Sequence, residues 1–132
     1  MDKDKTTEIE KIKKAVKCYI DGTIEQDYNL IFKGWHQDGK MMALNEDKTL
    51  KIYDRSIWQK WYENTKKNPD VKRSSEILNI DFEGVAANAK VKTIVETPEG
   101  TTIYMDYLNL LKIEDTWQIA NKIFNTTKKP KN

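Results

Sequence analysis

The chain has 132 residues, of which 38% are hydrophobic and 33% charged, the composition of a small, highly soluble globular protein. Its formal net charge of +2 argues against a nucleic-acid partner, and its single cysteine excludes an internal disulfide bond or a zinc site built from cysteines. No apolar run is long enough to cross a membrane, so no membrane partner is expected. We expect one domain over residues 1–132, with an ordered core over about 6–126.

These properties favour a cytoplasmic protein that needs no metal and no cofactor. Residues 1–10 lack the apolar segment of a signal peptide, and a signal peptide removed before this sequence begins is the alternative. His36 is the only histidine in the chain, which argues against a His-rich metal site. The lysine clusters at 11–17 and 128–131 are expected to be the solvated face of a helix and a frayed tail.

Helical periodicity marks the N-terminal part of the chain. A first helix is predicted with Thr6 or Thr7 as its cap, the latter in a capping box with Glu10, and it is expected to end at Asp21-Gly22 or shortly after. A second, shorter helix is predicted from Asp27 to about Lys33, and Gly34 can end it.

Strands dominate the rest of the chain. Lys40–Leu44 and Leu50–Tyr53 predict a β-hairpin, and Asp54 is expected to cap a third helix with Trp58 and Trp61 on its apolar stripe. The further strands are predicted at residues 75–82, 87–95, 101–113 and 117–124. This order predicts an α+β fold in which helices cover one face of a curved antiparallel sheet.

The hairpin from Thr101 to Phe124 bears most directly on function. A three-residue loop at 114–116 would place Ile113 opposite Trp117, and Asn109 would then face Asn121 on the apolar side. An unpaired buried amide costs about 1–3 kcal/mol, so these two groups need partners. Two interpretations follow: an amide pair that satisfies itself, or the polar floor of a ligand pocket.

The opposite side of the same hairpin carries Asp106, Leu108, Leu110 and Lys122. The two leucines are costly if they are left in water, so this side is also expected to be covered. The predicted cover is a homodimer contact through the outer face of the sheet, with Asp106 and Lys122 as ion-pair partners.

Several segments resemble the nuclear transport factor 2-like superfamily. They are 106–108, 110–113, 117–119 and 121–124 at the C-terminal end, with 19–22, Asp27, Trp35-His36, 80–84 and 87–91 before them. More narrowly, the chain resembles the branch described as putative lumazine-binding, a neighbour of the polyketide-cyclase-like group, over about 8–125. This resemblance implies a cone-shaped sheet wrapped around the N-terminal helices, an open-ended hydrophobic cavity, and a homodimer through the outer sheet face.

The resemblance also suggests where acid–base chemistry would lie. Enzymes of the ketosteroid isomerase type use a cavity carboxylate as base and a tyrosine with a protonated aspartate as oxyanion donors. Tyr19 resembles that tyrosine in position, and His36 and Asp38 fall near the expected base. Asp106 lies on the strand of the second carboxylate, but the predicted register puts it on the outer face. Each residue has a purely structural alternative: a core tyrosine, a rim or capping histidine.

Three functions are therefore weighed. The first is a small-molecule-binding cone protein with a hydrophobic pocket for a planar or apolar ligand and with Asn109 and Asn121 as polar anchors. The second is an isomerase, dehydratase or cyclase acting on a small carbonyl-containing substrate, in which His36 or Asp38 is the base and Tyr19 polarises the carbonyl. The third is a dimeric accessory module whose cavity is packed shut. The predicted ligand-binding residues are Tyr19, Trp35, His36, Trp61, Tyr107, Asn109 and Asn121.

Overall fold

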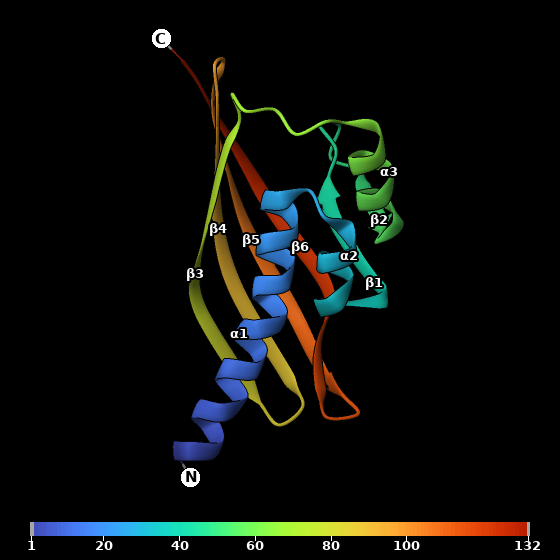
Figure 1. The fold of residues 1–132 in the computed structure, drawn as a ribbon, viewed down its shortest axis with the longest axis vertical. Coiled ribbons are helices and arrows are strands. Elements are labelled where there is room, and N and C mark those ends of the chain that lie inside the picture. Colours follow the sequence, from blue (N-terminus) through green and yellow to red (C-terminus); the bar gives the residue numbers. More distant parts are fainter. Residues whose placement is uncertain (1, 132) are drawn as a thin grey trace.

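The computed structural model describes residues 2–131, with side chains for residues 4–131 (Figure 1). Over that range the chain forms three helices and six strands: α1 (Asp2–Glu25), α2 (Tyr28–Gly34), β1 (Trp35–Leu44), β2 (Leu50–Asp54), α3 (Ser56–Asn64), β3 (Lys72–Glu83), β4 (Ala86–Thr97), β5 (Gly100–Ile113) and β6 (Thr116–Pro130). The strands form one sheet in the order β2-β1-β6-β5-β4-β3, so the predicted α+β class is confirmed. None of these helices is both long and apolar enough to span a membrane.

The sheet curves around α1. Strands β3 to β6 form the predicted antiparallel meander, and α1 crosses their concave face diagonally (Figure 1). Strands β1 and β2 extend the sheet beyond β6, with α2 and α3 nearby (Figure 1). Strand β1 pairs with β6 in parallel, with Met42 opposite Ile123. The sequence does not predict this pairing, because neither strand carries a signal that identifies a partner so far along the chain.

The helices differ from the predictions mainly at their ends. Helix α1 begins at Asp2, so Thr7 lies inside it and the predicted capping box is wrong. Its last residue, Glu25, lies just beyond the predicted end. Helix α2 begins one residue after its predicted start, because Asp27 is its N-cap and the Asp27 carboxylate accepts a hydrogen bond of 3.2 Å from the N–H of Leu30.

Gly34 ends α2 as predicted and also lets two helices approach each other. A Cβ atom added at Gly34 would overlap the carbonyl oxygen of Ala15 in α1 and lie 3.1 Å from its carbonyl carbon. Only a glycine leaves that room. Trp35 follows directly and begins β1 with its side chain buried.

The core fills the space between α1 and the concave face of the sheet. Its fully buried side chains include Ile12, Val16 and Tyr19 from α1 and Leu108, Leu110 and Ile119 from β5 and β6. Trp35 of β1 and Trp58 of α3 extend this core, with their ring centroids 4.6 Å apart in an edge-to-face arrangement. Burial of one large apolar side chain contributes about 1.5–3 kcal/mol, so these residues dominate the stability of the fold.

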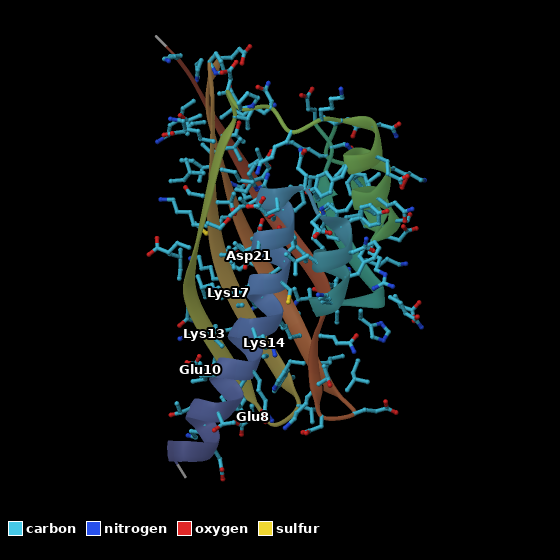
Figure 2. The ribbon with its side chains drawn as sticks, viewed as in Figure 1. Glu8, Glu10, Lys13, Lys14, Lys17 and Asp21 are labelled. Atoms are coloured by element: carbon cyan, nitrogen blue, oxygen red, sulfur yellow. The ribbon has the colours of Figure 1, made fainter. Side chains whose placement is uncertain are left out.

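Glu8 links helix α1 to β5 and β6 close to the turn that joins these two strands. Its carboxylate accepts hydrogen bonds from the Lys112 ammonium and from the Trp117 indole N–H, the latter 3.0 Å long. Figure 2 labels Glu8 near the N-terminal end of α1 and, further along the helix, Glu10, Lys13, Lys14, Lys17 and Asp21. The latter five side chains are exposed, so the predicted solvated face of this helix is confirmed.

The turn between β5 and β6 is shorter than predicted. Glu114 and Asp115 form a two-residue turn with φ values of 49° and 68°, both in the left-handed region. Ile113 therefore pairs with Thr116, and the predicted pairing of Ile113 with Trp117 is wrong.

An irregularity beside Leu110 compensates for the shorter turn. Beyond it Asn109 pairs with Asn121, as predicted. The shorter turn and this irregularity together place Trp117 and Ile119 on the same side of the sheet as Leu110, and this side is buried. The predicted division of side chains between the two faces of the hairpin is therefore wrong next to the turn.

The buried face is consequently the one that holds Asp106 and Lys122, with 1% and 6% of their surfaces exposed. The sequence predicts a dimer contact on this face, because Leu108 and Leu110 are costly if they are left in water. In the structure Asp106 and Lys122 form an ion pair, and both side chains are hydrogen-bonded to the Tyr19 hydroxyl, so neither charge lacks a partner. The exposed face is the one with Asn109 and Asn121.

Candidate functional site

Tyr19, Asp106 and Lys122 form a buried polar cluster at the centre of the fold. The Tyr19 hydroxyl donates a hydrogen bond of 2.8 Å to Asp106 Oδ2 and accepts one of 2.6 Å from Lys122 Nζ. The same Nζ lies 3.6 Å from Asp106 Oδ1. Helix α1, strand β5 and strand β6 each supply one member, so the cluster forms only when all three elements are packed together.

The surroundings shift the titration of two members of the cluster. Burial lowers the pKa of Lys122 to about 8; the Asp106 charge opposes this shift and the Arg73 charge adds to it. Burial, followed by the negative charge of Asp106, raises the pKa of Tyr19 well above its usual range. At neutral pH the tyrosine is therefore a neutral donor, and a fraction of Lys122 is an uncharged amine.

An open cavity of about 700 Å³ lies next to this cluster, and Tyr19 and Lys122 form part of its wall. Seven of the fifteen described residues that line the cavity are aromatic: Tyr19, Tyr53, Trp58, Trp61, Tyr62, Tyr104 and Phe124. Paired rings give these walls a fixed shape, as in the edge-to-face contact of Tyr53 with Trp61 at 5.5 Å. The volume lies within the range of pockets that hold small organic ligands.

Arg73 of β3 also lines the cavity, and the Nε atom of its guanidinium group has no hydrogen-bond acceptor within the described residues. The group lies over the ring of Tyr104, 5.8 Å from its centroid. Its Nε atom is buried and lacks a hydrogen-bond partner within the part of the chain that the structure describes. Buried polar groups normally have partners, so this nitrogen marks a position where a bound molecule would gain a bond.

Among the predicted ligand-binding residues, Tyr19 and Trp61 line the cavity. Trp35 does not line it; it packs behind Tyr19 in the core, with ring centroids 5.8 Å apart. Its indole N–H donates to the carbonyl oxygen of Gly39 at 3.1 Å, so its polar group is satisfied.

Tyr107, Asn109 and Asn121 lie on the opposite, convex face of the sheet, away from the cavity. Asn88 Nδ2 donates to Asn109 Oδ1 (3.0 Å), and Asn109 Nδ2 donates to Asn121 Oδ1 (2.8 Å). The interpretation of a self-satisfying amide pair is thus correct, extended by a third residue. The prediction that these amides form a pocket floor is wrong, because the shortened turn exchanged the two faces.

His36 and Asp38 do not reach the cavity either. They lie in the irregular first part of β1, where His36 Nδ1 accepts a hydrogen bond of 3.0 Å from the N–H of Asp38. The Asp38 side chain is 82% exposed. His36 thus bonds to the backbone two residues along its own strand, and neither His36 nor Asp38 is brought together with Tyr19.

Sequence reasoning missed most residues of this site, among them Trp58, Tyr62, Arg73 and Lys122. The first two lie on the predicted apolar stripe of α3, so periodicity could have identified them. Lys122 was assigned to the wrong face by the turn error. Arg73 carries no local signal, because its position opposite Lys122 depends on the curvature of the whole sheet.

Three helices with a curved six-stranded sheet wrapped around α1 form the cone fold of the nuclear transport factor 2-like superfamily. Within it, the chain belongs to the family described as putative lumazine-binding, whose sequence model matches residues 7–125. No curated protein matches the chain significantly.

Solved structures share this fold at low sequence identity. An NTF2-like protein of unknown function from Shewanella baltica has a TM-score of 0.80 and 22% identity, over 92% of this chain and 95% of that one. A hexachlorocyclohexane dehydrochlorinase, LinA type 3, from Novosphingobium barchaimii has a TM-score of 0.77 and 10% identity, over 99% and 94%. A ketosteroid isomerase-like protein from Erwinia carotovora atroseptica has a TM-score of 0.64 and 16% identity, over 87% and 92%. The fold is thus common to enzymes and to proteins of unknown function.

Proposed function

We propose that the protein binds a small planar molecule in the aromatic cavity. The observation that carries this proposal is the cavity of about 700 Å³ next to the buried Tyr19–Lys122 pair. Apolar walls supply affinity, while a few fixed polar groups at one end orient a ligand. Flat walls of tyrosine and tryptophan favour a flat ligand, since stacked or edge-on rings gain about 0.5–1.5 kcal/mol beyond burial.

The experiment is a titration of planar bicyclic compounds, lumazine among them, followed by calorimetry. Trp61 lies at the mouth and is 41% exposed, so Trp61→Ala can be made with little risk to folding. We expect this variant to bind at least tenfold more weakly, a loss of about 1.4 kcal/mol. Asn109→Ala, on the convex face, is the matched control and should bind as the unchanged protein does. Equal affinity of Trp61→Ala and the unchanged protein would contradict the proposal.

A second candidate is acid–base catalysis, supported by one observation: Lys122, whose pKa lies at about 8, is next to the cavity. Its neutral amine could accept a proton from a carbon next to a carbonyl group. The predicted role of Tyr19 fits less well, because its one hydroxyl proton is donated to Asp106 and does not point to a substrate. Solvent deuterium exchange into small ketones, followed by NMR, tests this candidate, with Lys122→Met as the variant that should abolish exchange.

We also propose a homodimer through the convex face, where Tyr107, Leu111 and Ile123 are exposed. The amide row from Asn88 to Asn121 ends in a free acceptor (Asn88 Oδ1) and a free donor (Asn121 Nδ2), considering partners within residues 4–131. A two-fold axis along the strands would set each free donor against the free acceptor of the other copy, as self-complementary interfaces require.

The oligomeric state of the protein in solution tests the proposed homodimer. Analytical ultracentrifugation of the unchanged protein should give a dimer, and Leu111→Lys should give a monomer, since a charge at a covered apolar position is costly. Leu78→Lys is the control, because Leu78 is equally exposed but lies on the edge strand β3. A monomer at every concentration of the unchanged protein would remove the proposal.

A further inference from the structure

We propose that the ligand of the cavity carries a single negative charge, as an aromatic carboxylate does, and that this group binds between Lys122 and Arg73. This inference rests on the proposed small-molecule binding and adds the chemical class of the ligand.

The first argument is the charge balance of the inner cavity. Lys122 and Arg73 contribute two positive charges, and Asp106 contributes one negative charge. At the mouth, the exposed Glu46 and Lys128 have opposite charges and cancel. Among the described residues that surround the cavity, one positive charge therefore remains without a counterion in a site walled by aromatic rings, where a desolvated charge is costly.

The second argument is the supply of donors. Of the three protons on Lys122 Nζ, one is donated to the Tyr19 hydroxyl and a second is held near Asp106 Oδ1 by the ion pair, at 3.6 Å and without a hydrogen bond to that oxygen within residues 4–131. The third remains for a ligand. The buried Nε of Arg73 also lacks an acceptor within residues 4–131, and no ion pair engages its guanidinium there. A carboxylate accepts from an arginine and a lysine at once, through charge-assisted bonds about twice as strong as neutral ones.

The third argument is what these cations contact at present. The Lys122 ammonium lies 4.6 Å from the ring centroid of Phe124, and the Arg73 guanidinium lies 5.8 Å from that of Tyr104. A ring face stabilises a cation more weakly than a hydrogen-bonded anion does, so these contacts leave room for a stronger partner. Phe124 and Tyr104 contact each other, with 6.1 Å between their ring centroids, and both line the cavity, so together they form a surface against which the flat body of an aromatic acid can lie.

A matched set of probes separates charge from shape: 2-naphthoate, 2-naphthamide and 2-naphthylmethylammonium, each titrated by calorimetry at pH 7. We expect naphthoate to bind at least tenfold more tightly than naphthamide, and the ammonium compound to bind weakest. In Arg73→Gln the naphthoate affinity should fall to the naphthamide level, while the naphthamide affinity stays unchanged. Arg73→Lys should recover part of the loss. Lys90→Gln, on the convex face, is the charge-matched control and should change nothing.

A pH series gives a second measurement that needs no variant. The charged and titratable groups around Lys122 and its cavity come from several elements: Tyr19 on α1, Tyr53 on β2, Tyr62 on α3, Arg73 on β3, Tyr104 and Asp106 on β5, and Glu46 and Lys128 at the mouth. Of these, Lys122 loses its proton between pH 7 and 9.5, with a pKa of about 8. The naphthoate affinity should fall about tenfold or more over this interval, whereas the naphthamide affinity should not.

The outcomes distinguish this inference from the proposal on which it rests. If naphthamide binds as tightly as naphthoate, and Trp61→Ala weakens both, the cavity binds planar molecules and the preference for an anion is overturned. If none of the three probes binds, both proposals fail. If Arg73→Gln and the pH series leave the naphthoate affinity unchanged, the anion does not bind between Arg73 and Lys122 and the inference is wrong.

Discussion

Asp106 and Lys122 form an ion pair, 3.6 Å from Oδ1 to Nζ, on the buried face of the sheet. Tyr19 connects to both side chains through its hydroxyl, so one helix and two strands meet at three polar atoms. This arrangement defines the inner face of the cone and the inner end of the cavity.

The ion pair predicts strong coupling between its two members. Asp106→Ala or Lys122→Met alone should destabilise the fold by about 3–5 kcal/mol, because each leaves a buried charge without its partner. The double variant should recover much of that loss, since neither charge remains. Urea unfolding of the four proteins measures the coupling, and additive losses in the double variant would contradict it.

Lys122 also predicts how stability depends on pH. Its folded pKa of about 8 lies below its unfolded value of 10.5, so between these values the unfolded chain binds more protons and the free energy of unfolding rises with pH. The expected gain is about 2 kcal/mol between pH 8 and 10. Above pH 10 the raised pKa of Tyr19 acts in the opposite direction. Lys122→Met should lose the rise, whereas Lys128→Met should keep it.

Glu8 predicts a separate effect at low pH. The hydrogen bonds from Lys112 and then from Trp117 lower the pKa of Glu8 below 4.5. Its stabilising effect is therefore present above that pH and is lost as the pH falls through the lower, folded value. Glu8→Gln should show a smaller loss of stability in acid and an altered Trp117 fluorescence. Glu10→Gln, an exposed neighbour on the same helix, should behave as the unchanged protein does.

Gly34 predicts a steric effect between helices. Gly34→Ala should destabilise by about 1–3 kcal/mol, because the added Cβ overlaps the backbone of Ala15 and two helices must separate. Gly84→Ala is the comparison, since its Cβ would meet nothing within 4 Å and only its φ of 57° opposes the change. Thermal unfolding of both variants tests this, and an equal loss in the two would show that packing at Gly34 is not tight.

The elements were predictable from the sequence because their signals are local. Asp27 caps a helix through its own side chain, and the apolar stripe of α3 lies within nine residues. The faces of the last hairpin were not predictable in the same way. The Glu114–Asp115 turn adopts left-handed φ values without the glycine or asparagine that usually marks such a turn.

The site was less predictable than the fold. Tyr19 was found through its position on α1, but its partners were assigned to the outside. A lysine and an aspartate on a strand usually indicate a solvated face, and only the three-dimensional pairing reverses that inference. The position of Arg73 in the cavity wall depends on sheet curvature, which no local pattern encodes.

The parallel pairing of β1 with β6 has a consequence for how the chain folds. Strand β6 is last in the sequence, yet it lies in the sheet between β1 and β5. During synthesis β1 and β2 leave the ribosome early. One edge of β1 then stays unpaired until Ile123 and its neighbours in β6 have also emerged. The final strand closes the sheet from its middle, so the fold should be slow to complete and sensitive to truncation at its C-terminal end.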